Sequence, residues 1–239
     1  AVLSTHTMFS GFTCKDLTDQ IEPIAAHWKE SGLGFDAVYT GYLASAEQID
    51  YVCAFFDAFR REGRLIVVAP VMAANGKLYP AFGPDFPAQM ARVCAKADLI
   101  LPNLTEASLL TGLPYRTEHD EVYIKELLQA LAALGPRYVA LTGVSFEPDK
   151  LGVMYYDKVT GQYGSYFTQH LPASFHGTGD VFASTCVGGL MRGLELGDAL
   201  ALAADYTVES IRCTLESPDA NWYGVEFERA IPYLVQHLN

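Results

Sequence analysis

Short runs of apolar residues alternate with segments of helical periodicity along most of the chain. Continuous apolar runs of four to eight residues are typical of parallel strands that are buried on both faces. We therefore expect strands at 35–43, 65–68, 99–101 and 138–141. The periodic segments between them predict helices at 45–61, 85–96, 105–110 and 118–134, with Ser45 as an N-cap and a loop at 73–77.

The pattern changes after residue 150. Two segments of alternating polarity, 152–156 and 163–170, are separated by a short loop at 158–161, which predicts a β-hairpin. Helices are expected near 180–193, 197–216 and 226–238. Repeated strand–helix units predict a doubly wound α/β fold, in which helices flank a mostly parallel sheet and the hairpin precedes the segment 176–180.

The length of the chain indicates a single domain, 1–239. Half of the 239 residues are hydrophobic and 18% are charged, which suits one α/β core. Ala1-Val2-Leu3 resembles the end of a strand more than a chain terminus. We therefore expect the domain to be incomplete at its N-terminal end.

The formal net charge of −12 limits the possible partners. A protein that binds the phosphate backbone of nucleic acids needs a basic stripe, and the sequence contains none. No apolar run reaches the roughly 18–20 residues of a membrane-spanning helix. The five cysteines are scattered and form no metal-binding motif, so we expect them to be buried in apolar helical contexts of a cytoplasmic protein.

The segment Gly177-Thr178-Gly179-Asp180 lies between the predicted hairpin and a predicted helix. Two glycines allow the backbone to approach a ligand closely, and the positive end of the helix dipole can hold a phosphate. Asp180 could accept a proton from an attacking hydroxyl group. The alternative is an ordinary glycine turn in which Asp180 caps the helix.

Other polar residues follow the predicted strands, where ligands bind in doubly wound folds. Asn103 and Glu106 follow one buried strand. The Glu106 carboxylate could hold Mg²⁺ directly or through water, or it could simply decorate a helix N-terminus. Thr142 closes another strand and could contact nucleotide phosphates or belong to a plain turn.

Polar residues near the N-terminus could bind a small aromatic ring. Ser4, His6 and Thr7 lie at a predicted strand end, and Tyr42 follows Thr40-Gly41 in the same layer. Hydrogen bonds and packing from such residues can hold a flat ligand. His6 could equally be a structural hydrogen-bonding residue.

Several segments together resemble the pyridoxal kinases of the ribokinase-like superfamily in order and spacing. They are Ser4-Thr5-His6-Thr7, Tyr39-Thr40-Gly41-Tyr42, Pro70-Val71-Met72 with Asn75-Gly76-Lys77-Leu78-Tyr79, Pro102-Asn103-Leu104-Thr105-Glu106-Ala107, and His176-Gly177-Thr178-Gly179-Asp180. The resemblance extends from Ser4 to the C-terminus. It implies phosphorylation of the 5′-hydroxyl of pyridoxal, pyridoxine or pyridoxamine by ATP with Mg²⁺. A monovalent cation such as K⁺ could also take part. The resemblance further implies a cytoplasmic homodimer.

The resemblance also implies a role for each matching residue. Asp180 would be the catalytic base, and the three residues before it would form an anion hole: Gly177, Thr178 and Gly179. Thr7 and Tyr42 would contact the pyridoxal ring, with Ser4 and His6 beside them. Glu106 would be a metal-associated carboxylate, with Asn103 and Thr142 on the nucleotide side.

Two features depart from that family. Its members begin with a strand and a loop containing Ser and Gly, to which nothing here corresponds. They usually carry Asp where this chain has Ala69, and often another Asp where it has Ala74. Alanine cannot accept a hydrogen bond or offset the charge of Mg²⁺ and nucleotide, on which phosphoryl transfer depends.

Three functions therefore remain open from the sequence. The first is a pyridoxal kinase. The second is a kinase of the same superfamily with another acceptor, such as a hydroxymethylpyrimidine or a sugar. The third is a vitamin B6-binding protein without turnover, which the alanines at positions 69 and 74 favour.

Overall fold

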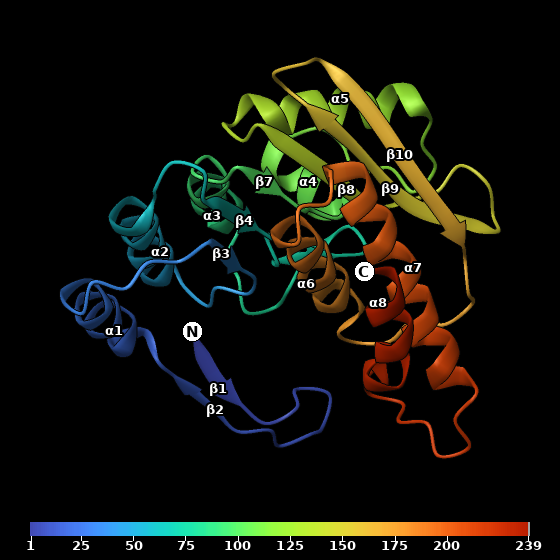
Figure 1. Cartoon of the computed structure of the whole chain (residues 1–239), viewed down its shortest axis with the longest axis horizontal. Helices are drawn as coiled ribbons and strands as arrows, with labels where there is room; N and C mark the ends of the chain where they lie inside the picture. Colours follow the sequence, from blue (N-terminus) through green and yellow to red (C-terminus); the bar gives the residue numbers. More distant parts are fainter. Residues whose placement is uncertain (239) are drawn as a thin grey trace.

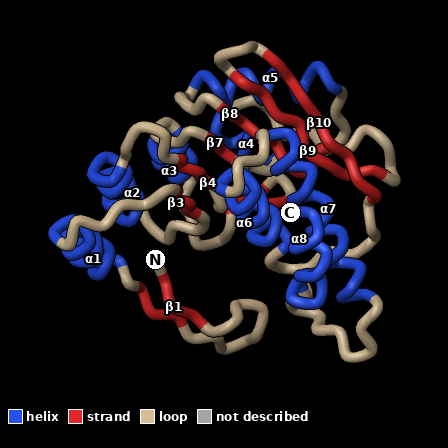
Figure 2. Tube along the Cα trace, in the orientation of Figure 1, coloured by secondary structure: helices blue, strands red, loops and turns tan. Residues whose placement is uncertain are grey.

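The computed structural model describes residues 1–238, which form a six-stranded sheet between two layers of helices (Figures 1 and 2). The strand order is β10-β9-β8-β7-β4-β3. β3 (Ala37–Thr40), β4 (Leu65–Val68), β7 (Leu99–Ile100) and β8 (Tyr138–Val144) are parallel, whereas β9 (Lys150–Asp157) and β10 (Gln162–Gln169) form an antiparallel hairpin at one side. The predicted doubly wound α/β fold is confirmed.

Helices cover both faces of this sheet. One face packs against α2 (Ala46–Phe59), α3 (Phe86–Cys94), α4 (Leu104–Thr111) and α5 (Glu121–Ala133). The other packs against α6 (Thr178–Met191) and α7 (Leu196–Leu215). A short 3₁₀ helix, η1 (Phe227–Ala230), and α8 (Ile231–His237) pack against α7. No helix within residues 1–238 is long and apolar enough to cross a membrane.

The apolar strand β4 shows why the sheet has two cores. Successive side chains of a strand point to opposite faces. Ile66 and Val68 accordingly lie in the core under α2–α5, and Val67 lies in the core under α6 and α7. Polar positions on either face would leave unpaired groups buried, so a continuous apolar run is required here.

The N-terminal segment stands apart from the main sheet. β1 (Val2–Ser4) and β2 (Cys14–Asp16) form a separate antiparallel hairpin, and α1 (Thr18–Glu30) follows it. Neither β2 nor α1 was expected from the sequence. The expectation that all cysteines are buried is wrong for Cys14, because it lies on this exposed hairpin, and Cys213 is only partly buried; Cys53, Cys94 and Cys186 are buried.

Two further segments differ from the sequence-based expectation. The loop expected at 73–77 contains a minimal hairpin of β5 (Ala73–Ala74) and β6 (Lys77–Leu78), because Asn75 and Gly76 both adopt positive φ and turn the chain within two residues. The helix expected at 226–238 is divided into η1 and α8, with a proline at the start of α8.

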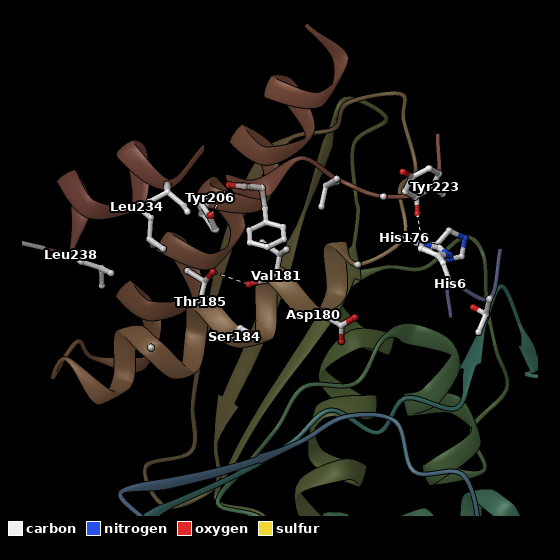
Figure 3. A pocket seen from close by; sticks show the side chains of 17 residues that line it. His6, His176, Asp180, Val181, Ser184, Thr185, Tyr206, Tyr223, Leu234 and Leu238 are labelled. Carbon is white, nitrogen blue, oxygen red and sulfur yellow. Dashed lines mark hydrogen bonds between the residues drawn. The ribbon is translucent and has the colours of Figure 1, made fainter. Parts of the chain in front are cut away.

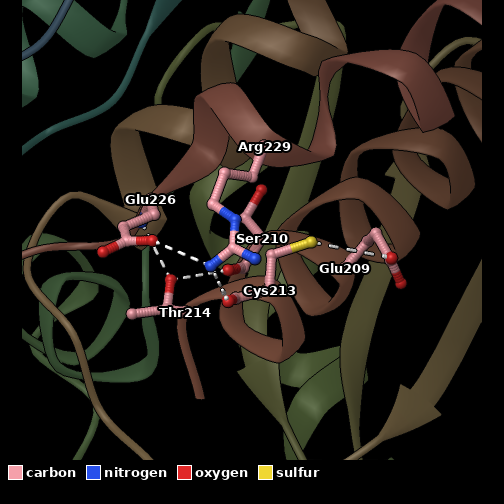
Figure 4. A network of polar contacts seen from close by, with 6 residues as sticks. All are labelled: Glu209, Ser210, Cys213, Thr214, Glu226 and Arg229. Atoms are coloured by element: carbon pink, nitrogen blue, oxygen red, sulfur yellow. Dashed lines mark hydrogen bonds and ion pairs between the residues drawn. The ribbon is translucent and has the colours of Figure 1, made fainter. Parts of the chain in front are cut away.

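A polar network fixes the chain between α7 and η1 (Figure 4). The Thr214 hydroxyl accepts a hydrogen bond from the backbone N–H of Glu226 at 2.8 Å. The Arg229 guanidinium donates to the Cys213 carbonyl at 3.1 Å and to the Glu226 carboxylate at 3.2 Å. These contacts close the loop 216–226, which carries part of the candidate site.

Candidate active site

The carboxyl ends of the parallel strands meet at one edge of the sheet, and the predicted site residues lie along it. Tyr42 follows β3, Ala69 follows β4, Asn103 follows β7, and Thr142 lies near the end of β8. β10 runs parallel to β8, because each is antiparallel to β9. The chain therefore returns to the same edge before α6 begins, as expected for the ligand-binding edge of this fold.

The first turn of α6 has the features of a candidate anion site. Gly177 is its N-cap residue and has a φ of 87°, a left-handed conformation that favours glycine. No side chain in the described part of the chain caps this helix. Its first N–H groups thus lack intrahelical partners, and the helix dipole favours negative charge at the same place.

Asp180 lies in this first turn and is exposed. The alternative in which Asp180 caps the helix is wrong, because Gly177 is the N-cap and the Asp180 side chain makes no capping bond. Its carboxylate projects from the helix beside the cavity described next (Figure 3). An exposed carboxylate beside a candidate anion site is free to accept a proton from a bound hydroxyl group.

A cavity of about 760 Å³ extends from this turn along α6 (Figure 3). Its polar end is lined by two histidines, a threonine and the start of α6: His6, His176, Thr7, Gly177 and Asp180. Its other end is apolar and is formed by α6, η1 and α8, including Val181, Phe227, Ile231, Leu234 and Leu238. The structure thus brings together four predicted site residues that lie up to 174 positions apart.

His6 connects the N-terminal hairpin to the rest of the cavity wall. Its Nδ1 accepts a hydrogen bond from the backbone N–H of Met8 at 3.2 Å, so the neutral ring carries its proton on Nε2. Nε2 then donates to the Tyr223 carbonyl at 3.0 Å. The ring also lies edge-on to Phe9 and His176, at centroid distances of 5.8 and 6.5 Å. The structural interpretation of His6 is therefore supported alongside the binding one.

The other predicted ring contacts lie outside this cavity. Ser4 is exposed at the end of β1, where it pairs with Cys14. Tyr42 is 41% exposed, and its ring lies 5.5 Å from that of Phe82. Phe82 in turn stacks on Phe86 at 3.9 Å. The Tyr42 ring is thus accessible to a ligand, while Phe82 packs against it.

Glu106, at the start of α4, belongs to a second group of predicted site residues together with Asn103 and Thr142. It forms a capping box with Asn103: the Asn103 side chain accepts from the Glu106 N–H, and the Glu106 carboxylate accepts from the Asn103 N–H, both at 2.9 Å. The Met72 N–H donates to the other carboxylate oxygen at 3.2 Å. Burial raises the pKa of Glu106 to about 7, although these backbone donors act in the opposite direction.

These contacts bear on whether Glu106 suits a magnesium ion. Backbone N–H groups already occupy both of its oxygens. Within residues 1–238, no three His, Cys, Asp or Glu side chains come together as a metal-binding group. Mg²⁺ usually keeps several waters and binds substrate phosphates. These residues therefore suit a Mg²⁺ ion whose direct ligands are phosphate oxygens and water molecules. The Glu106 carboxylate would then contact the ion through one of those waters.

Thr142 joins the same group through the backbone. It forms an isolated parallel bridge with Asn103, its N–H donates to the Pro102 carbonyl at 2.9 Å, and its hydroxyl donates to the same carbonyl at 3.3 Å. The next residue, Gly143, has a φ of 75° and lies at a bulge in β8. Asn103, Glu106 and Thr142 are thus tied together at adjacent strand ends.

Two tyrosines interact electrostatically with both Asp180, at the cavity, and Glu106, in the group with Asn103 and Thr142. Burial raises the pKa of Tyr39 to about 12, and the charges of Asp180 and Glu106 add to the shift. Burial, Glu106 and Asp180 also raise the pKa of Tyr79. Both phenols therefore lie within the field of both carboxylates. Sequence reasoning gave no role to Tyr39 beyond its place in the Tyr39–Tyr42 segment, and it missed Tyr223, for which the sequence offers no signal.

The comparison with known proteins identifies the family. The family model described as phosphomethylpyrimidine kinase matches residues 17–222. This chain belongs to that family. The range includes both carboxylates of the site and all strands of the main sheet. The resemblance to the pyridoxal kinases inferred from the sequence is confirmed, because relatives with that activity in their names are found as well.

Three relatives illustrate the range of functions. A protein from Bacteroides thetaiotaomicron assigned to the phosphomethylpyrimidine kinases, solved in a crystal form with pyridoxal, is 38% identical, with a TM-score of 0.92 over 98% of this chain and 83% of that one. The pyridoxine kinase of Bacillus subtilis is 29% identical over 76% of this chain and 65% of its own length. The thiamine biosynthesis bifunctional protein ThiED of Geobacter sulfurreducens is 33% identical over 76% of this chain and 36% of its own length. The chain thus spans less than two thirds of these two curated relatives.

Proposed function

We propose that this chain transfers the γ-phosphoryl group of ATP to the 5′-hydroxyl of pyridoxal, pyridoxine or pyridoxamine. One observation carries the proposal: the exposed Asp180 carboxylate and the uncapped first turn of α6 lie at the same end of the cavity as His6 and Thr7. A proton acceptor, an anion site and ring-binding groups are therefore available together.

The chemistry assigns each group a step. Asp180 accepts the proton of the substrate hydroxyl as its oxygen attacks the γ-phosphorus, and the bond from that phosphorus to the oxygen of the leaving ADP breaks. The N–H groups of residues 177–179 stabilise the charge on the transferred phosphoryl group. Mg²⁺, when bound, neutralises phosphate charge, with Glu106 contributing through water and Asn103 and Thr142 on the nucleotide side. K⁺ could support the same site.

We assign recognition of the substrate ring to residues of the N-terminal hairpin and of the segment that follows β3. Thr7 lines the cavity, and His6 is fixed there by its bond to the Tyr223 carbonyl. Tyr42, which follows β3, offers a partly exposed aromatic ring near Cys14 of β2. The crystal form of the 38% identical relative with pyridoxal supports a B6 vitamer as the ligand.

A second candidate function is phosphorylation of a hydroxymethylpyrimidine. The description of the family model favours it. Both candidates use the same base and anion site, and they differ only in the ring that is bound. A panel of pyridoxal, pyridoxine, pyridoxamine and hydroxymethylpyrimidine with Mg-ATP separates them. We expect the highest kcat/KM with a B6 vitamer; a higher value with the pyrimidine would favour the second candidate.

The alternative of binding without turnover has its own test. Ala69 lies at the end of β4 with 8% exposure, and Ala74 lies in β5. We expect phosphate transfer to pyridoxal in the parent and faster transfer in Ala74→Asp with Mg²⁺. Calorimetric binding of pyridoxal with no product, in the parent and in both Ala69→Asp and Ala74→Asp, would instead establish a vitamin-binding protein.

A further inference from the structure

Tyr39 occupies a distinctive position at the carboxyl end of β3. It pairs with Val67 in the sheet, and its ring packs into the core beneath α6. Its hydroxyl group extends past the end of the strand, because a Cβ atom built on Gly41 would lie 3.7 Å from the Tyr39 oxygen. The hydroxyl thus reaches the edge of the sheet at which the site lies.

Asp180 approaches the same place from α6. On a helix, residues three and seven positions apart lie on one face. Asp180 therefore shares a face with Ala183 and Val187, both of which belong to the core that holds the Tyr39 ring. Asp180 lies one turn nearer the start of this helix, which contacts β3, and the charge of its carboxylate acts on Tyr39.

The Tyr39 hydroxyl has no structural role that explains this placement. Some tyrosines in the described chain use their hydroxyls in hydrogen bonds within the fold: Tyr51 donates to Glu47 at 3.1 Å, and Tyr166 donates to Asp205 at 2.7 Å. The Tyr39 hydroxyl makes no hydrogen bond with residues 1–238, although its ring is partly buried against the core. A phenol in this position remains protonated at neutral pH and can act only as a donor to the nearby carboxylates.

We propose that Tyr39 is a positioning residue, which donates a hydrogen bond to the Asp180 carboxylate when the substrates are bound. The bond fixes which carboxylate oxygen faces the substrate hydroxyl. A positioned base is more effective than a mobile one, because proton transfer requires heavy-atom distances of about 2.6–3.2 Å. This inference rests on the proposed function, in which Asp180 is the base.

Tyr39→Phe removes only the hydroxyl group and tests the proposal directly. We expect kcat to fall about 10- to 100-fold, as is typical of losing a hydrogen bond to a charged group, while the KM values for ATP and vitamer stay within about twofold. The urea midpoint should stay close to that of the parent. Tyr51→Phe is the matched control, since it also removes a tyrosine hydroxyl near a carboxylate, and it should leave kcat unchanged.

A double-mutant cycle with Asp180→Asn distinguishes positioning from a general structural effect. If Tyr39 acts through Asp180, adding Tyr39→Phe to Asp180→Asn causes no further loss of the residual rate. Equal losses in both backgrounds would overturn the proposal, as would a Tyr39→Phe enzyme with parental kcat. If the residual rate of Asp180→Asn is too low to measure, the kinetics of the Tyr39→Phe single variant test the proposal instead. A loss of activity that comes from a higher KM or from lower stability, with kcat unchanged, would overturn the proposal. Parental turnover in Asp180→Asn would instead refute Asp180 as the base, a separate failure.

Discussion

The His6 imidazole donates a hydrogen bond to the Tyr223 carbonyl at 3.0 Å, across 217 positions of the chain. The contact joins the N-terminal hairpin, which within residues 1–238 makes no strand pairing with the main sheet, to the loop that follows α7. Phe9 strengthens this junction by packing against the rings of Trp222 and Tyr223 at 5.4 and 5.1 Å. The wall of the cavity near Asp180 therefore depends on both ends of the sequence.

Replacement of His6 by alanine should weaken substrate binding. It removes the bonds to Met8 and Tyr223, each worth about 0.5–1.5 kcal/mol, and so releases the hairpin from the cavity wall. We expect the KM for the vitamer to rise roughly tenfold, with a smaller effect on kcat. Steady-state kinetics provide the measurement, and His27→Ala, on the exposed surface of α1, is the control. An unchanged KM would show that the hairpin is held by its aromatic contacts alone.

Asp180→Asn should abolish most phosphoryl transfer without unfolding the protein. The amide cannot accept the proton of the attacking hydroxyl, so we expect a loss of about 10²–10⁴-fold in kcat. Because Asp180 is exposed and does not cap α6, the unfolding free energy should change by no more than about 1 kcal/mol. Asp198→Asn, in the first turn of α7, is a matched control for the helix-dipole effect. Activity similar to the parent would exclude Asp180 from proton transfer.

The sequence was sufficient to predict those parts of the fold whose signal is local. β4 was predicted at its observed bounds, because a buried parallel strand requires an unbroken apolar run. The start of α2 was marked by Ser45, which adopts the expected N-cap role. β2 and α1 carry no such signal: all residues of β2 are exposed, and α1 has no buried residue and contains a proline.

The presence or absence of a local sequence signal also explains which parts of the candidate site could be predicted. The glycine turn at the start of α6 could be predicted, because Gly177 and the helix that follows are neighbours in sequence. The capping box of Asn103 and Glu106 is equally local, since three residues separate its members. The His6–Tyr223 bond and the approach of Tyr39 to Asp180 arise from tertiary packing between distant segments, so no spacing in the sequence could indicate them.

The buried Glu106 carboxyl should make stability depend on pH. Its pKa is raised from 4.5 to about 7, so the folded state binds this proton more tightly than the unfolded state does. The stabilisation is fully present below about pH 4.5 and is lost as the pH rises toward 7 and above, up to about 3 kcal/mol. Urea unfolding from pH 5 to 8 without Mg²⁺ should show this decline in the parent and a flatter dependence in Glu106→Gln. Glu121→Gln, in the exposed first turn of α5, should keep the parental slope, and equal slopes in all three proteins would contradict the prediction.

Two adjacent glycines of α6 should respond in opposite ways to replacement by alanine. A Cβ on Gly188 would meet no atom within 4 Å, so Gly188→Ala should stabilise the protein by roughly 0.5–1 kcal/mol through the lower entropy of its unfolded chain. A Cβ on Gly189 would lie 3.2 Å from the Ala199 Cβ and from a Leu194 methyl group. Gly189→Ala must therefore push α6 away from α7, at a cost of about 1–3 kcal/mol. Urea unfolding of both variants provides the measurement, and equal shifts in the same direction would show that the two helices adjust freely to the added methyl group.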